Sequence, residues 1–278
     1  MTLMFTSAAN PKIKQIRALR QRKQRDATGL FVVEGIRHVG EAAEASRAAD
    51  ASGSEDAGWL EYLCYCPDLL TSDFARDLVQ KQQERGLPCY AVSAATFESL
   101  AEKENPPGIL AVARQRHRQL AELAPGKFSW GVALVAPQDP GNIGTILRTI
   151  DAVGASGLLL LDSSADPYHP SAVRASMGSL FWHPVIEATF TEFTRWAKGN
   201  GVHIYGTSAR GSLPAREISG YARPAILLMG SEREGLNEAQ RAVCETLIRL
   251  PMKGRVTSLN LAVATGVMLY AMLEKIEG

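Results

Sequence analysis

Cysteine and histidine are scarce in this sequence, and neither occurs in a pattern that would hold a metal ion. The cysteines lack a Cys-x-x-Cys pair, which argues against the common zinc and redox motifs and indicates reduced thiols in a cytosolic protein. The histidines are scattered along the chain without ligand spacing, so we expect no metal site. The four cysteines are Cys64, Cys66, Cys89 and Cys244.

Long apolar runs and an excess of one charge are absent as well. The aliphatic run Leu158–Leu161 has the length of a strand, whereas a membrane-spanning helix needs about 20 apolar residues. The N-terminus contains no basic segment followed by an apolar run, so we expect no export signal, no membrane contact and a cytoplasmic location. Lysine and arginine total 30 against 29 acidic residues, so the bulk charge indicates no particular partner.

The sequence does contain enough apolar material for two folded domains. Hydrophobic residues make up 46% of its 278 residues, which is typical of a globular protein with substantial cores. Strand-like segments alternate with helical segments in both halves, and this alternation predicts an α/β fold. A Pro125-Gly126 step separates the halves. We therefore expect domains at residues 1–118 and 128–278, joined by a linker at 119–127.

Basic residues gather at both ends of the first domain. Asn10-Pro11 favours a helix start, and the helix that we expect to follow is basic as far as Arg25. Such a helix could contact RNA phosphates or could be an ordinary solvated face, and the residues alone leave both open. The candidate RNA-binding residues are Lys12, Lys14, Arg17, Arg20, Arg37 and Arg114.

A turn after the predicted strand 130–136 opens the first helix of the second domain, which carries Asn142 and Arg148. This succession of a strand, a glycine turn and a helix is similar to a dinucleotide-binding fingerprint. However, only Gly141 and Gly144 are present, at the wrong spacing for that motif. Arg148 could be a surface residue of a largely apolar helix, or it could reach a site at the strand ends.

Two later segments also carry polar groups beside small residues. One buried strand ends in a Gly-Ser-Glu turn that offers Glu232, although such a turn is also ordinary before a helix. The closing helix, 259–273, is apolar on every face, so we expect it to be buried all round, with Thr257 or Ser258 as its cap. Ser258 and Asn260 are then either a cap and a core asparagine or part of a ligand site.

Three of these segments together resemble the three motifs of the SpoU (TrmH-type) RNA ribose methyltransferases, in the same order. They are Asp-Pro-Gly-Asn-Ile-Gly-Thr-Ile-Leu-Arg at 139–148, Met-Gly-Ser-Glu-Arg-Glu-Gly-Leu at 229–236 and Leu-Pro-Met-Lys-Gly-Arg-Val-Thr-Ser-Leu-Asn at 250–260. The first half is similar to the family's N-terminal substrate-binding domain through residues 10–14, 31–35 and 105–112, the last beginning at Asn105.

This resemblance implies a fold that no periodicity in the sequence would predict. It implies a SPOUT-superfamily α/β domain with a mostly parallel sheet and a deep trefoil knot, preceded by a small α/β, ribosomal-protein-like RNA-binding domain. It also implies a homodimer through the C-terminal domain and S-adenosylmethionine as the methyl donor. The donor-binding positions carried over from the family are Thr207, Met229, Gly230, Leu250, Met252 and Leu259.

The implied reaction is methyl transfer to a ribose 2′-hydroxyl, in ribosomal RNA of the 23S type by family likeness. An alcohol is a poor nucleophile at neutral pH, so a base or a neighbouring charge must assist it. The family likeness assigns this role to Arg148. Because arginine hardly loses its proton, orienting a phosphate or offsetting alkoxide charge is the easier role. We expect Asn142, Glu232, Ser258 and Asn260 to complete the catalytic site.

Three other functions are weighed against this one. A non-catalytic RNA-binding protein could use the same scaffold, although the polar residues of the three motifs would then have no role. A tRNA ribose methyltransferase would share the chemistry and differ only in its substrate. A nicotinamide-dependent enzyme would need the glycine spacing that this chain lacks.

Overall fold

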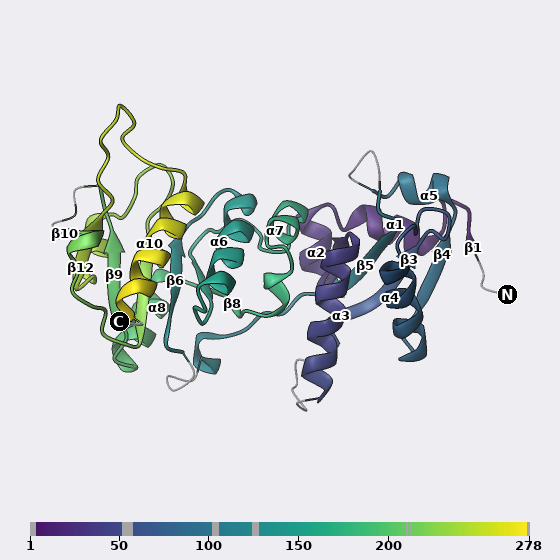
Figure 1. The fold of residues 1–278 in the computed structure, drawn as a ribbon, viewed down its shortest axis with the longest axis horizontal. Coiled ribbons are helices and arrows are strands. Elements are labelled where there is room, and N and C mark those ends of the chain that lie inside the picture. The colour runs from purple at the N-terminus through teal and green to yellow at the C-terminus, as the bar shows by residue number, and fades with distance from the viewer. Residues whose placement is uncertain are drawn as a thin grey trace. The chain divides into compact units, whose positions relative to one another are not determined.

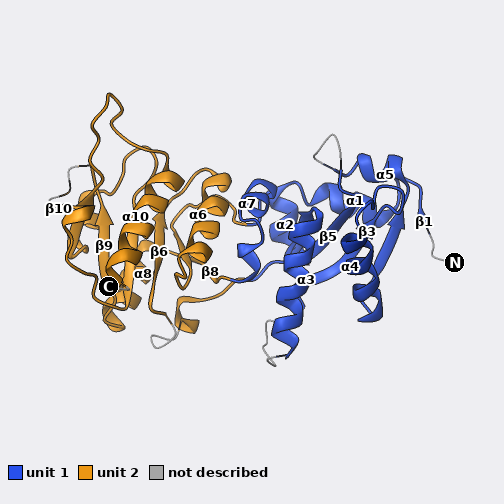
Figure 2. Cartoon of the chain, viewed as in Figure 1, with its two compact units in different colours: residues 1–116, 168–182 blue, residues 117–167, 183–278 orange. Residues whose placement is uncertain are grey.

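The computed structural model describes residues 4–51, 58–101, 106–123, 128–209, 211 and 213–276. The chain forms two compact units, coloured separately in Figure 2. Unit 1 contains Met1–Arg116 with Tyr168–Trp182, and unit 2 contains His117–Pro167 with His183–Gly278. Asn105, which belongs to a predicted motif, and residues 124–127 of the expected linker lie outside the described residues.

Unit 1 is built on a five-stranded sheet with the strand order β1-β4-β3-β5-β2 (Figure 1). Strands β2 and β3 run antiparallel to β5, whereas β4 runs parallel to both β1 and β3. The strands are β1 (Met4–Phe5), β2 (Leu30–Glu34), β3 (Leu60–Tyr65), β4 (Cys89–Val92) and β5 (Ile109–Arg114). The helical elements are α1 (Pro11–Ala18), α2 (Arg22–Thr28), α3 (Ile36–Ala51), α4 (Asp73–Glu84), α5 (Ala94–Glu98), α7 (Pro170–Ala175) and the 3-10 turn η2 (Ser179–Phe181).

The continuous basic helix predicted after Asn10 is wrong, because the chain forms two helices, α1 and α2, with a break between them. Asn10 caps α1, and its side-chain oxygen accepts from the Lys12 N–H at 2.8 Å. Arg25 is buried, and its guanidinium donates to the carbonyls of Leu19 at 2.9 Å and Arg20 at 2.8 Å. These bonds satisfy carbonyls left at the end of α1, so Arg25 stabilises the break.

The segment 168–182 packs in unit 1, although in sequence it lies within the second domain. The ring of Phe31 in β2 lies 4.8 Å from the ring of Tyr168, between centroids. Trp59 meets Phe181 edge-on at 5.2 Å. Aromatic pairs in such arrangements contribute stability beyond their buried area. Unit 1 is therefore completed by residues that follow its last strand by more than 50 positions.

Unit 2 contains a seven-stranded parallel sheet with the order β10-β12-β9-β11-β6-β7-β8, which confirms the predicted mostly parallel α/β domain. Strands β6, β7 and β11 are buried along their whole length, as expected for parallel strands covered on both faces. The strands are β6 (Trp130–Val135), β7 (Leu158–Leu161), β8 (Val185–Ala188), β9 (His203–Thr207), β10 (Leu213–Pro214), β11 (Ala225–Met229) and β12 (Thr246–Arg249). The helices are α6 (Pro140–Ala152), α8 (Phe190–Gly199), α9 (Glu238–Ala242) and α10 (Leu261–Ile276).

The closing helix α10 is capped by Asn260, and the prediction of Thr257 or Ser258 as its cap is wrong. The side-chain oxygen of Asn260 accepts from the backbone N–H of Ala262 at 2.9 Å. An asparagine immediately before the helix satisfies the free N–H groups of the first turn as well as a hydroxyl does. The hydroxyl-bearing residues lie in the irregular segment before the helix.

The prediction that α10 is buried all round is also wrong for the single chain. Val263, Val267 and Tyr270 are 52%, 48% and 52% exposed, and their spacing puts them on one stripe of the helix. The helix packs against α6 (Figure 1), where a Cβ on Gly266 would lie 3.8 Å from the methyl group of Thr149. No helix in the described part of the chain combines the length and the apolar character needed to cross a bilayer.

Candidate functional site

The carboxyl ends of β6 and β11 lie side by side in unit 2, because the two strands are parallel neighbours with Leu134 opposite Met229. The turn after β6 leads into α6, and the turn after β11 begins with Gly230. A Cβ on Gly230 would lie 2.1 Å from the carbonyl carbon of Gly235. Only glycine therefore allows this turn to fold back on itself at the sheet edge.

Three predicted catalytic residues meet in a chain of hydrogen bonds at this edge. The amide of Asn260 donates to Asn142 Oδ1 at 3.0 Å. The amide of Asn142 then donates to Glu232 Oε1 at 3.3 Å. Each of the three residues comes from a different predicted motif, so the chain joins segments that are 90 and 118 residues apart in sequence.

The surroundings of these hydrogen bonds hold the Glu232 carboxylate in place. Asn142 lies in the first turn of α6 and is only 7% exposed, so its donor and its acceptor both need partners. Glu232 accepts from the start of α6, where the helix dipole favours a negative charge. The two partners of Asn142 also determine which side of its amide is oxygen and which is nitrogen.

Gln138 also belongs to this site, although the sequence does not predict it as a site residue. Its backbone N–H lies 3.3 Å from each carboxylate oxygen of Glu232. Its side-chain amide donates to the carbonyls of Ala136 at 2.8 Å and Ser163 at 3.2 Å. These bonds hold the turn that presents the N–H to Glu232. The only signal in the sequence was its position directly before the first motif.

The other two predicted catalytic residues do not join this hydrogen-bond chain. Arg148 is exposed on α6, about 120° around the helix from Asn142. Among the described residues it makes no hydrogen bond or ion pair. Ser258 is exposed in the irregular segment that precedes α10. Both side chains are therefore open to a ligand or a partner.

Most of the predicted donor-binding residues lie at or just after the carboxyl ends of neighbouring strands. Strands β12, β9 and β11 are consecutive in the sheet and parallel, so Thr207, Met229 and Leu250 come to one edge. Thr207 Oγ1 donates to the Leu228 carbonyl at 3.4 Å, which links β9 to β11. The set is completed by the buried Gly230, the half-buried Met252 and Leu259, which is 39% exposed.

This edge fits a nucleoside-like donor in its chemistry. A Cβ on Gly206 would lie 2.4 Å from Cys244 Sγ, and a Cβ on Gly211 would lie 2.7 Å from the Leu247 carbonyl oxygen. Protein atoms already fill the space that side chains at these glycines would need, so the two glycines allow close packing beside the strand ends. Backbone N–H and C=O groups there can bind an adenine edge, and the apolar residues nearby can cover its faces.

Two predicted RNA-binding residues of α1 already make contacts within unit 1. Lys12 Nζ lies 4.3 Å from the ring centroid of Tyr62. The guanidinium of Arg17 donates to Ser99 Oγ at 2.6 Å. Burial raises the pKa of Tyr62, so its ring stays uncharged beside the cation. Neither contact neutralises a positive charge, so both cations can still attract phosphate.

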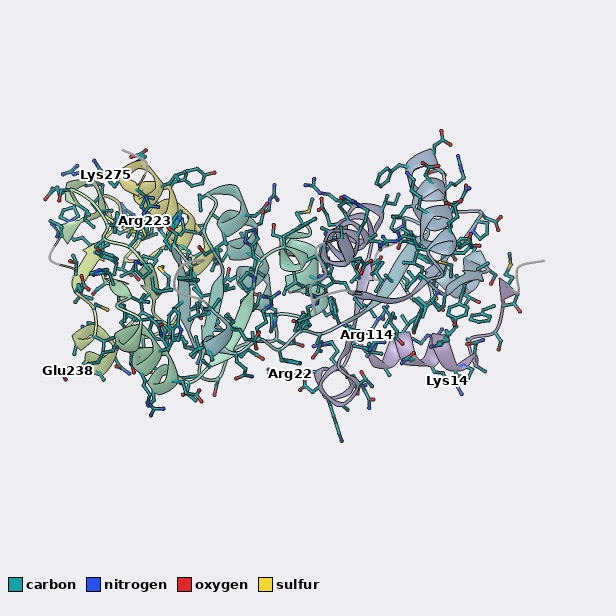
Figure 3. All side chains as sticks on the ribbon, turned by 90° about the horizontal axis from the view of Figure 1, so that it is seen from below. Lys14, Arg22, Arg114, Arg223, Glu238 and Lys275 are labelled. Atoms are coloured by element: carbon teal, nitrogen blue, oxygen red, sulfur yellow. The ribbon has the colours of Figure 1, made fainter. Side chains whose placement is uncertain are left out.

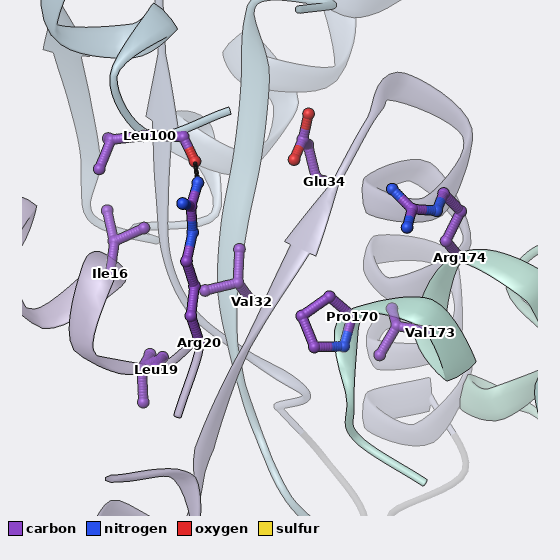
Figure 4. Close-up of a pocket in the computed structure, with 9 residues that line it drawn as sticks. All are labelled: Ile16, Leu19, Arg20, Val32, Glu34, Leu100, Pro170, Val173 and Arg174. Atoms are coloured by element: carbon purple, nitrogen blue, oxygen red, sulfur yellow. Dashed lines mark hydrogen bonds between the residues drawn. The ribbon is translucent and has the colours of Figure 1, made fainter. Parts of the chain in front are cut away.

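Arg20 lines a hollow in unit 1, where its guanidinium donates to the Leu100 carbonyl at 2.6 Å (Figure 4). The wall is mostly apolar, with Glu34 and Arg174 as the other charged residues. The lining residues are Ile16, Leu19, Arg20, Val32, Glu34, Leu100, Pro170, Val173 and Arg174. None of the predicted catalytic residues lines this hollow.

The remaining predicted RNA-binding residues differ in their surroundings. Lys14 and Arg37 are exposed, and neither makes a hydrogen bond or ion pair within the described ranges. Lys14 points away from the ribbon of α1 in Figure 3. Arg114, at the end of β5, forms an ion pair with Glu61 of β3. Of the six predicted RNA-binding residues, Lys14 and Arg37 are thus the two that make no hydrogen bond, ion pair or ring contact among the residues that the structure describes.

Each of the two parts of the chain matches a known protein family. The SpoU rRNA Methylase family matches residues 129–270, and the MRM3-like substrate binding domain matches residues 10–111. A 23S rRNA (guanosine(2553)-2′-O)-methyltransferase of Bacillus subtilis is 31% identical over 95% of this chain and 96% of its own. A 23S rRNA (uridine(2479)-2′-O)-methyltransferase of Streptomyces viridochromogenes is 32% identical over 98% of this chain and 93% of its own. A solved AdoMet-bound rRNA methyltransferase of Sinorhizobium meliloti is 35% identical and covers 98% of both chains, with a TM-score of 0.85.

Proposed function

Because the chain belongs to the SpoU rRNA methylase family, we propose that it methylates a ribose 2′-hydroxyl of ribosomal RNA, with S-adenosylmethionine as donor. The observation that carries this proposal is the pair of hydrogen bonds that links Asn260 to Asn142 and Asn142 to Glu232. These bonds bring residues of three separate motifs together at one edge of the sheet. A binding protein without catalytic activity would not need such a polar cluster.

The residues of this edge would hold the donor and leave its methyl group open to the RNA. When bound, the donor supplies an electrophilic methyl group on a positively charged sulfur. The backbone at Met229 and Gly230 and the segment at Leu250 and Met252 would bind its adenine and carboxylate. Thr207 and Leu259 would complete the walls of the site.

The polar chain would position the reacting groups. Glu232, fixed by Gln138 and Asn142, would accept hydrogen bonds from the ribose or from an incoming arginine. Asn260 would orient the segment before α10, and Ser258 in that segment would contact the donor or the RNA. These roles require the three motifs to keep a fixed geometry, which the two asparagine amides provide.

Arg148 would act on the RNA, not on the donor. Its guanidinium is exposed and stays charged, so it would bind the target phosphate and offset the charge that develops on the 2′-oxygen. We expect Arg148→Ala to lower methyl transfer at least about 100-fold. Donor affinity, measured by calorimetry, should change less than about twofold because Arg148 lies outside the hydrogen-bond chain.

Arg241→Ala is the matched control, since Arg241 is an exposed arginine of unit 2 on the short helix α9. It should leave both quantities unchanged. Equal losses of transfer and donor affinity in Arg148→Ala would contradict the role assigned to this residue.

The homodimer, the trefoil knot and the domain roles are part of the same proposal. The exposed apolar stripe of Val263, Val267 and Tyr270 favours a second copy of the chain packed on α10. Family membership favours the knot around the donor site. Residues 1–118 would bind the RNA, 119–127 would link the domains, and 128–278 would carry the catalysis.

Mapping of ribose methylation across total RNA, with and without the protein, tests the proposed function. We expect one 2′-O-methylated nucleotide in the large-subunit ribosomal RNA to depend on the protein and on the donor. Methylation confined to tRNA would replace the ribosomal substrate with the tRNA alternative. RNA binding without any donor-dependent methylation would favour the non-catalytic alternative.

A further inference from the structure

Two large aromatic side chains of unit 1 are exposed on elements that contact α3. Phe74, in the first turn of α4, is 62% exposed, and Trp182, directly after η2, is 44% exposed. Both α4 and η2 pack against α3, so the elements that carry the two rings contact the same helix (Figure 1). Exposed rings in contact with water are unfavourable for folding and often mark a binding surface.

The ring of Phe74 lies beside Gly40, in the middle of α3. A Cβ on Gly40 would lie 3.6 Å from two carbon atoms of that ring. Glycine inside a helix destabilises it relative to alanine. At 3.6 Å a Cβ on Gly40 would make an ordinary van der Waals contact, so the ring rests on α3 without depending on the glycine.

A second glycine brings the turn before Trp182 close to α3. Gly178 has a φ of +103°, and a Cβ there would lie 2.4 Å from Cγ of Glu41. The indole N–H of Trp182 donates to Glu41 Oε2 at 2.9 Å. This bond uses the polar edge of the ring, so the orientation of the ring is fixed while part of its surface faces solvent.

Arg37 lies on the same face of α3, about one turn before Gly40 and Glu41. It is exposed and makes no ion pair or hydrogen bond among the described residues. Several other charges of α3 and α4 are neutralised in pairs, whereas the carboxylate of Glu41 on this face accepts only the indole N–H of Trp182 among the described residues. These pairs are Glu44–Arg47, Asp73–Arg76 and Asp77–Lys81.

We propose that Phe74, Trp182 and Arg37 form an aromatic platform that binds unpaired RNA, with bases stacked on the two rings and a phosphate at Arg37. This inference rests on the proposed function, because it assigns part of the substrate to unit 1. Stacking on aromatic rings is the usual way in which proteins bind single-stranded RNA, and it tolerates any base. The match of residues 10–111 to a substrate-binding domain favours RNA over a protein partner.

The platform is tested by the affinity of the full-length protein for an unpaired RNA oligonucleotide, measured by fluorescence anisotropy at several salt concentrations. We expect Phe74→Ala and Trp182→Ala each to weaken binding roughly 5- to 100-fold without changing the salt dependence, because stacking carries no charge. Arg37→Ala should instead reduce the slope of log binding affinity against log salt concentration by about one. Lys81→Ala, on α4 but paired with Asp77, is the control and should bind as the wild type does.

Phe74→Leu distinguishes stacking from a simple apolar contact and retains an apolar side chain if the alanine variant folds poorly. Stacking predicts that it binds as weakly as Phe74→Ala, whereas binding at the wild-type level contradicts the platform. Trp182 fluorescence should be quenched by the oligonucleotide, and Trp182→Phe should lose the quenching while keeping most of the affinity. Unchanged affinity in every platform variant overturns the inference and leaves the methylation proposal intact. Absence of donor-dependent methylation by the wild type overturns the methylation proposal, whatever the platform variants show.

Discussion

A single side chain, Asn142, connects the three motifs of the candidate site. A carboxylate in its place would lose the N–H that reaches Glu232 and would face that carboxylate across about 3.3 Å. We expect Asn142→Asp to lower the free energy of unfolding by about 1–3 kcal/mol and methyl transfer at least about 100-fold. Thermal unfolding and donor-methyl incorporation into RNA measure the two effects. Thr145→Ala, on the exposed side of α6, serves as the control, and transfer within twofold of the wild type would contradict this role for Asn142.

Three thiols, one buried and two half-buried, should be inert in the folded protein. Burial raises the pKa of Cys64 to about 12 and the pKa of Cys89 and of Cys244 to about 11, each from 9.0. At pH 8 these thiols are protonated, so we expect slow reaction with a thiol-specific reagent in the native state and fast reaction in denaturant.

The same shifts set the sign of an alkaline effect on stability. Above about pH 9 the unfolded chain loses thiol protons that the folded chain still holds, so the free energy of unfolding should fall as pH rises toward 11. Denaturant titrations between pH 8 and 10.5 measure this change. Rapid labelling of the native protein at pH 8 would contradict the raised pKa values of these thiols.

At the scale of an element, the turn after β11 depends on the absence of a side chain. We expect Gly230→Ala to lower the free energy of unfolding by about 3 kcal/mol or more, because its Cβ would overlap the backbone of Gly235. Gly220→Ala is the control, since a Cβ there would have no neighbour within 4 Å. Thermal unfolding of both variants and donor titration by calorimetry measure the result. A wild-type unfolding temperature for Gly230→Ala would show that the turn can relax.

Two predictions about where helices begin and end were wrong. The basic stretch after Asn10 has a helical pattern throughout, yet it breaks into α1 and α2 because Arg25 satisfies the carbonyls at the break. A charged side chain that folds inward leaves no trace in local periodicity. The sequence predicts a hydroxyl cap for α10 for a similar reason, because it does not show that the Asn260 side chain bonds to the backbone of Ala262.

At the scale of the whole molecule, we expect association through α10. A charge at the centre of a covered apolar stripe would be buried without a partner, so Val267→Glu should convert the proposed dimer to a monomer and abolish most of the transfer activity. Sedimentation velocity measures the change. Val243→Glu is the matched control, because Val243 is an exposed valine at the end of α9, outside the stripe. An unchanged sedimentation coefficient for Val267→Glu would exclude the stripe as the interface.

The sequence alone determined the α/β class of both halves, the three motif segments and the polar residues within them, because these depend on local patterning and on residue chemistry. Only the tertiary structure decided which of those residues meet: Asn142, Glu232 and Asn260 join in one chain, whereas Arg148 and Ser258 stay apart from it. It also decided that residues 168–182 complete unit 1. Contacts between residues tens of positions apart arise from chain topology, and a linear pattern carries no direct record of topology.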